Sequence, residues 1–140
     1  AVKAALDEGI VAGGGVTLVH LAGTVKVASS DSEAAGHQLL KNALEQPFRI
    51  LMANAGINAD EFLPQVRTGK GLTGVNVNDP SKMVNLKQSG IVDPARVTKE
   101  AIQNAVSIAG TAMTMGALVV DIPEEAKAEM PGMGGMGGMM

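Results

Sequence analysis

Apolar residues recur at helical spacing through most of the chain. The clearest run follows three consecutive glycines, where apolar positions fall at i, i+3, i+4 and i+7: Leu18, Leu21, Ala22 and Val25. This spacing is typical of an amphipathic helix. Residues 1–8 have a helical composition and end at Gly9, a suitable helix stop. The pattern predicts a mainly α-helical fold, an antiparallel bundle of closely packed helices.

Polar residues and prolines mark where the middle helices begin and end. Ser30 followed by Glu33 forms a capping box, which predicts a helix that continues through Leu44. Pro47 suits a first helical position. A separate helix is therefore predicted from Pro47 to a stop at Gly56.

The helical pattern weakens in the next segment. Asn58 and Glu61 predict the start of a short helix, in which Pro64 forces a kink or an early end. Residues 67–78 are rich in Gly, Asn and Thr and predict a loop with a short hairpin. Lys70 lies in Thr-Gly-Lys-Gly, but the spacing of a phosphate-binding loop is absent, so we interpret this segment as a basic turn.

A long helix is predicted after Asp93, which suits the N-cap, with Pro94 as the first helical residue. Its apolar stripe contains small residues that permit close packing: Val97, Ala101, Ala105, Ile108 and Ala112. Residues 117–123 predict a terminal strand that ends at Pro123. No second strand of this kind is predicted nearby, so it would pair outside this chain.

Composition narrows the class of protein. The chain has 140 residues, a net charge of −3 and no cysteine, which suits one domain in a reducing compartment. Scattered basic residues and the near absence of aromatic residues argue against nucleic-acid binding. No apolar run is long enough for a membrane span, so we expect a cytoplasmic protein. The chain lacks an initiator Met and starts within a helical pattern, so we expect a piece of a longer protein.

The Gly13-Gly14-Gly15 triplet admits two interpretations. It is either a tight joint between packed helices or a point where backbone approaches a ligand at the first turn of a helix. The residues alone favour the joint. His20 has no carboxylate partner at helical spacing, and we assign no role to His20 or to His37.

Three segments, in this order, resemble group I chaperonins, the bacterial and organellar chaperonin family. They are E-G-I-V-A-G-G-G-V at 8–16, G-I-V-D-P-A-R-V-T-K-E-A-I-Q-N-A-V-S-I-A-G at 90–110, and L-V-V-D-I-P-E-E at 118–125, followed by a Gly-Gly-Met tail. The resemblance implies that residues 1–123 are the C-terminal portion of the ATP-binding, ring-forming equatorial domain. On this reading the chain starts in the helix from the intermediate domain, and 124–140 is a flexible tail.

The resemblance also implies an ATP site. The glycine turn would lie against the ribose, the G-V-N-V segment would line the adenine, and the G-I-V-D-P segment would contact base and ribose hydroxyls. A carboxylate accepts from both ribose hydroxyls, and Asn both donates and accepts, which fits these roles. The implied contact residues are Gly13, Gly14, Val75, Asn76, Val77, Ile91 and Asp93.

For the whole protein the resemblance implies an ATPase that encloses unfolded polypeptides in stacked seven-membered homo-oligomeric rings closed by a co-chaperonin. The family's catalytic Asp and its ligands for Mg²⁺ and K⁺ correspond to positions before Ala1. We therefore expect ATP hydrolysis by the whole protein and none by this chain alone. The Met-rich tail is expected to touch non-native chains at the cavity floor.

Several positions depart from the family pattern. Val75 stands where an aromatic residue is usual, Val77 replaces Ala, and Gly116 replaces Glu. Asn58 stands where an acidic residue pairs with the other ring, which leaves Arg49 without its usual partner. These departures support an alternative, a non-catalytic helical oligomerisation domain that is a degenerate chaperonin copy.

Overall fold

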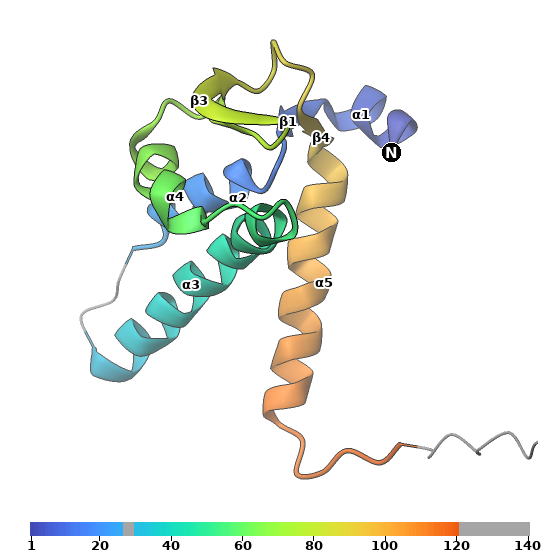
Figure 1. Cartoon of the computed structure of the whole chain (residues 1–140). Coiled ribbons are helices and arrows are strands. Elements are labelled where there is room, and N and C mark those ends of the chain that lie inside the picture. The colour runs from blue at the N-terminus through green and yellow to red at the C-terminus, as the bar shows by residue number, and fades with distance from the viewer. Residues whose placement is uncertain (27–29, 121–140) are drawn as a thin grey trace, which may run out of the picture.

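A computed structural model describes residues 1–26 and 30–120 (Figure 1). Five helices and four short strands make up this part of the chain, so the predicted mainly helical fold is confirmed. The elements in order are α1 (Val2–Glu8), β1 (Ile10–Ala12), α2 (Val16–Thr24), α3 (Asp31–Asn54), α4 (Ala59–Thr68), β2 (Thr73–Asn76), β3 (Asp79–Asn85), β4 (Val92–Pro94) and α5 (Ala95–Met113).

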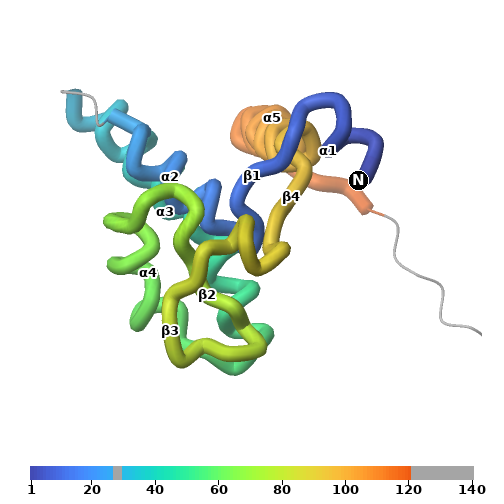
Figure 2. The backbone as a smooth tube through the Cα atoms, turned by 90° about the horizontal axis from the view of Figure 1, so that it is seen from above, coloured from blue at the N-terminus to red at the C-terminus, as the bar shows by residue number. Residues whose placement is uncertain are grey.

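The strands form two antiparallel pairs. The hairpin β2–β3 was predicted within residues 67–78, and it extends further, to Asn85. The other pair joins β1 to β4, which are separated in the sequence by α2, α3, α4 and the hairpin. Figure 2 shows β1 and β4 beside each other, between α5 and the hairpin. Three-residue strands carry too little alternation to be predicted from sequence.

The hydrophobic core lies where α2, α3 and α4 meet the hairpin. Phe48 from α3 is completely buried, and the apolar faces of α2 and α4 pack around it. The largest fully buried side chains come from the three helices and from the residue directly after β3: Phe48, Met52, Leu63, Leu86, Val16, Val19 and Val66. Burying each one contributes about 1.5–3 kcal/mol relative to exposure.

Helix α5 stands outside this core and has no buried residue. Figure 1 shows α5 diverging from α3, while α1 lies at its N-terminal end. Two ion pairs join α1 to α5, from Lys99 to Glu8 at 2.5 Å and from Arg96 to Asp7 at 3.9 Å. The chain therefore has one packed unit and one projecting helix.

Two predicted helix starts are wrong. Pro47 does not begin a helix but lies inside the continuous α3. Buried residues lie on both sides of Pro47, Glu45 before it and Phe48 after it, and their burial holds both halves in one helix although Pro47 removes a backbone hydrogen bond. Asp93 is not an N-cap: it lies in β4, paired with Val11, and α5 begins one residue later with Pro94 as the N-cap.

Other boundaries agree with the sequence. The side chain of Asn58 caps α4 by accepting from the Asp60 N–H at 3.1 Å, and α4 is short, with Pro64 inside it. Ser30 is the N-cap of α3, but its side chain makes no capping hydrogen bond. The predicted terminal strand is absent over 117–120, and its remaining residues lie outside the described part, as does the predicted tail.

Candidate functional site

The β1–β4 pair brings the glycine turn and Asp93 to one place. The register sets Val11 opposite Asp93 and Ala12 opposite Val92. The pairing continues into the turn, where the Gly13 N–H donates to the Ile91 carbonyl at 3.1 Å. Segments that are far apart in the sequence therefore share one edge of the molecule.

Each glycine of the triplet is required for a different reason. A Cβ on Gly13 would lie 3.0 Å from the Val92 nitrogen, so this position packs directly against β4. Gly15 has a φ of +76°, and its Cβ would lie 2.7 Å from the backbone nitrogen of Phe48 in α3. Gly14 has a φ of +65°, but a Cβ there would meet nothing within 4 Å. The tight joint predicted from sequence is formed by Gly13 and Gly15, and Gly14 faces open space.

Backbone donors remain free at this turn. The N–H groups of Gly14 and Gly15 donate to no acceptor among residues 1–26 and 30–120. Gly15 is also the N-cap of α2, and it has no side chain to satisfy the first turn of that helix. The helix dipole adds partial positive charge here. The turn can therefore donate hydrogen bonds to an acceptor that approaches over Gly14.

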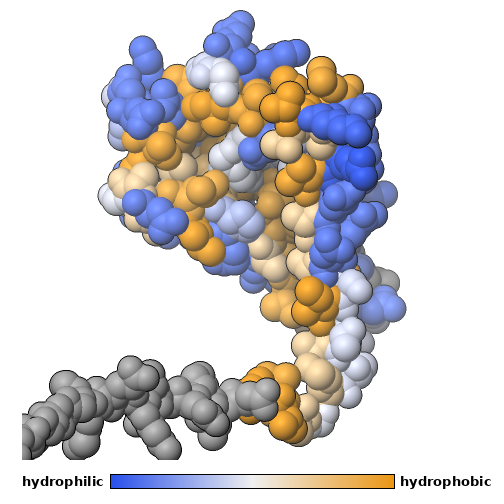
Figure 3. Space-filling view, turned by 90° about the vertical axis from the view of Figure 1, so that its right-hand side faces the viewer, coloured by the Kyte–Doolittle hydropathy of each residue, from blue (hydrophilic) through white to orange (hydrophobic). Residues whose placement is uncertain are grey.

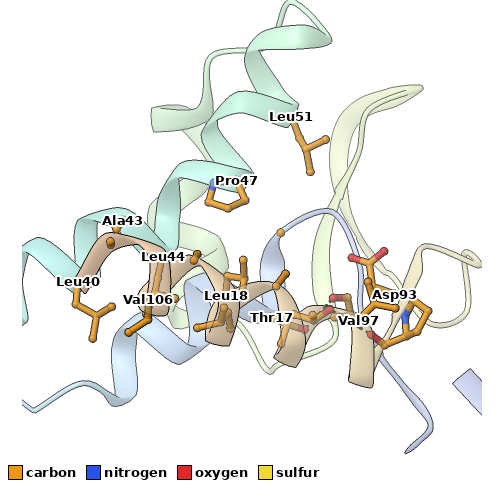
Figure 4. Close-up of a pocket in the computed structure, with 18 of the residues that line it drawn as sticks. Thr17, Leu18, Leu40, Ala43, Leu44, Pro47, Leu51, Asp93, Val97 and Val106 are labelled. Carbon is orange, nitrogen blue, oxygen red and sulfur yellow. Dashed lines mark hydrogen bonds between the residues drawn. The ribbon is translucent and has the colours of Figure 1, made fainter. Parts of the chain in front are cut away.

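A cavity of about 760 Å³ opens beside this turn, between α3 and α5 (Figure 4). Its walls are mostly apolar, and one side of α5 is hydrophobic whereas the other is hydrophilic (Figure 3). Among the described residues that line it, Asp93 is the only charged one, and Thr17 and Thr98 add hydroxyls. The Asp93 carboxylate is exposed and accepts no hydrogen bond from a described residue. It is thus available to a ligand that carries hydroxyl donors.

The three hairpin residues that were assigned to the base have different surroundings. The side chain of Val75 is buried in the core, so the residue offers only its backbone to a ligand. Asn76 is half-buried, and its Oδ1 accepts from the Asn78 N–H at 3.1 Å, while Val77 is exposed. The hairpin packs close to α2, since a Cβ on Gly74 would lie 2.8 Å from a methyl carbon of Val16. It therefore adjoins the helix that follows the glycine turn.

Sequence reasoning missed Thr17, which lies in the first turn of α2. Its Oγ1 donates to the Ala12 carbonyl at 2.8 Å, and so it spans the whole glycine turn. The sequence could not predict this bond, because its acceptor, the Ala12 carbonyl, is positioned by the pairing of β1 with the distant strand β4.

Two ion pairs fix α3 against α4. Arg67 donates to both carboxylate oxygens of buried Glu45 at 2.7 Å, and these hydrogen bonds raise the pKa of Arg67 although burial opposes the rise. Arg49 donates to Asp60 at 2.6 Å. Within this chain Asp60 is thus the carboxylate that pairs with Arg49, and the loss of a partner in the other ring stays a prediction.

The histidines mark no metal site. The buried Nε2 of His20 has no hydrogen-bond partner within the part of the chain that the structure describes. The same part holds no cluster of three or more His, Cys, Asp or Glu side chains arranged for a metal ion. None of its helices is both long enough and apolar enough to cross a membrane.

Comparisons with known proteins cover most of the chain. Residues 1–123 match the sequence model of the TCP-1/cpn60 chaperonin family. The crystal structure of a group III chaperonin in the open state is similar with a TM-score of 0.75 and 27% identity, over 83% of this chain and 25% of that one. The open-state monomer of a group II chaperonin from Methanococcoides burtonii is similar with a TM-score of 0.69 and 22% identity, over 76% of this chain and 28% of that one. The chain thus spans about a quarter of the length of these relatives.

Proposed function

Because the chain belongs to the TCP-1/cpn60 chaperonin family, we propose that it is the C-terminal part of the equatorial domain of an ATP-dependent chaperone. The protein that carries it would enclose non-native polypeptides and assist their folding. Within the family we propose group I, on the basis of the segments at 8–16 and 90–110 and of the Gly-Gly-Met tail.

One observation carries the proposed nucleotide site. The β1–β4 pair places the open backbone at Gly14 on the same edge as the unpaired carboxylate of Asp93. A ribose between them would receive backbone contact from the turn and would donate its hydroxyls to Asp93. Ile91 packs against the core beside the turn, and the backbone of Val75 with Asn76 and Val77 lies on the adjoining hairpin; these groups would contact the adenine.

This chain would supply the sugar and base contacts, and other parts of the whole protein would supply the chemistry. ATP provides the phosphoanhydride that is hydrolysed, with Mg²⁺ and K⁺ and a catalytic Asp held outside this chain. What residues 1–123 do is bind and orient the nucleoside and pack the ring. The isolated chain is therefore expected to bind nucleotide weakly and not to hydrolyse it.

Neutralising Asp93 tests the proposed site. Asp93→Asn removes the charge that accepts from the ribose hydroxyls, and a hydrogen bond to a charged group contributes about 1.5–3 kcal/mol. We expect the dissociation constant for ADP, measured by calorimetry on the chain, to rise by about tenfold or more. Glu61→Gln removes an exposed carboxylate from α4 and serves as the matched control. Equal affinity in the unaltered chain and Asp93→Asn would contradict the proposal.

The proposed partners follow from the family. The whole protein would form a homo-oligomer of stacked seven-membered rings in the cytoplasm, bind unfolded polypeptides and close with a co-chaperonin. The apolar cavity between α3 and α5 and the exposed apolar side of α5 support extensive packing against other segments or subunits.

The same surfaces favour a second candidate, a non-catalytic helical oligomerisation domain derived from a chaperonin. It would use the hydrophobic side of α5, including Val97 and Val106, and would have no nucleotide. ADP binding separates the two: the chaperone predicts affinity that depends on Asp93, and the oligomerisation domain predicts none.

A further inference from the structure

The geometry points to Thr17 as a positioning residue for the nucleoside site, acting by holding the glycine turn closed. This inference rests on the proposed nucleotide site and adds a residue that the sequence comparison did not suggest. Its basis is a side-chain hydrogen bond across the turn, from the Thr17 hydroxyl to the Ala12 carbonyl at 2.8 Å.

Gly13 is held against β4 and Gly15 against α3, so the middle of the turn depends on bonds that cross it. Gly14 and Gly15 both have positive φ angles, and fixing two glycines in this conformation costs conformational entropy on folding. The N-cap of α2 is Gly15, so no capping side chain fixes the start of the helix. The backbone bonds in the turn include Val16 N–H to Gly13 at 3.3 Å, a long contact. The hydrogen bond from the Thr17 hydroxyl to the Ala12 carbonyl is therefore shorter than the backbone bond from Val16 to Gly13 that also crosses the turn.

Both ends of this bond are anchored. Ala12 is the last residue of β1 and is fixed to β4 by the strand pairing. Thr17 lies in α2, which is fixed to the core by the buried Val16 and Val19. Holding these ends together keeps Gly14 in the open position with its N–H unpaired. Thr17 and Asp93 line the same cavity, as Figure 4 shows, so the side chain acts at the edge where the ribose would lie.

Thr17→Val removes the hydroxyl but keeps a branched side chain of similar size, and Thr17→Ser keeps the hydroxyl. Thr24→Val is the matched control, because Thr24 lies in the same helix outside the cavity and its hydroxyl makes a bond of the same length, to the Leu21 carbonyl at 2.8 Å. We expect Thr17→Val to weaken ADP binding about three- to tenfold, the range for one net hydrogen bond. Thr17→Ser and Thr24→Val should bind as the unaltered chain does.

A second measurement decides the inference without a ligand. Amide hydrogen exchange at Gly13 and Val16, whose N–H groups donate to Ile91 and Gly13, should be several-fold faster in Thr17→Val, whereas exchange at buried Ala22 further along α2 should stay unchanged. A purely stabilising role would accelerate exchange throughout α2 and leave the ADP dissociation constant of the folded chain unaltered.

The outcomes separate the two claims. Unaltered affinity and exchange in Thr17→Val would overturn the inference, and so would failure of Thr17→Ser to restore them. Absence of ADP binding to the unaltered chain would reject the proposed site, and with it the binding role of Thr17. In that case faster exchange at Val16 would support only the role of Thr17 in holding the turn closed.

Discussion

Gly14 and Gly15 have similar left-handed backbones in quite different surroundings. Gly15 faces the backbone of α3, whereas Gly14 faces open space. Gly15 is therefore required for packing, and Gly14 leaves room for a ligand. The sequence predicted that the triplet is either a tight joint or a site of ligand approach. In the structure Gly15 forms the joint, and the neighbouring Gly14 is open to approach.

Alanine substitutions distinguish these two glycines. Gly14→Ala adds the strain of a left-handed residue, about 1–2 kcal/mol. Gly15→Ala adds the same strain and also a Cβ only 2.7 Å from the Phe48 nitrogen, so we expect a total loss of about 3 kcal/mol or more. Urea unfolding of the two variants measures the difference. Equal losses would show that Gly15 does not pack against α3 as described.

At the scale of elements, α3 and α4 are joined by two ion pairs that differ in burial. Glu45 has a side chain that is 9% exposed, and it receives two hydrogen bonds from Arg67. Asp60, which pairs with Arg49, is 68% exposed. A buried carboxylate without its partner pays a desolvation cost that an exposed one does not.

Removing each arginine tests this difference. Arg67→Ala leaves the Glu45 carboxylate buried and unpaired, and we expect a loss of about 2–3 kcal/mol. Arg49→Ala, the control on the same pair of helices, should cost less than about 1 kcal/mol. Thermal unfolding monitored by circular dichroism measures both. A larger loss for Arg49→Ala than for Arg67→Ala would contradict the account.

The elements also show where sequence reasoning succeeds. The start of α4 at Asn58 and the end of α1 at Gly9 were predicted correctly, because a cap is a local interaction. Pro47 was misplaced, since burial of Phe48 overrides a local breaker. The role of Asp93 as a helix cap was wrong because its strand partner, Val11, is distant in the sequence. Local sequence signals therefore predict helix ends, whereas the candidate site depends on the pairing of β1 with β4, which are far apart in the sequence.

At the scale of the whole molecule, the packed unit and the projecting helix carry different parts of the stability. Phe48 is fully buried at the centre of the core. Ile108 in α5 is 70% exposed, and α5 has no buried residue. This chain spans about a quarter of the length of the chaperonin structures that it resembles.

Truncating one residue in each part tests this division. Phe48→Ala should cost about 3–5 kcal/mol, because it removes a large buried side chain and leaves a cavity. Ile108→Ala should change the free energy of unfolding by less than about 0.5 kcal/mol. Denaturant unfolding of the chain gives both values. A loss above 2 kcal/mol for Ile108→Ala would show that α5 is packed in solution.

The central claim is that the glycine turn and Asp93 together hold a ribose. Amide chemical-shift mapping with adenosine tests it most directly, with 2′,3′-dideoxyadenosine as the ligand that lacks both hydroxyls. The account predicts that adenosine shifts the amides of Gly14, Ile91 and Asp93 together and that the dideoxy compound shifts them far less. Equal shifts with both ligands, or adenosine shifts confined to other parts of the chain, would contradict it.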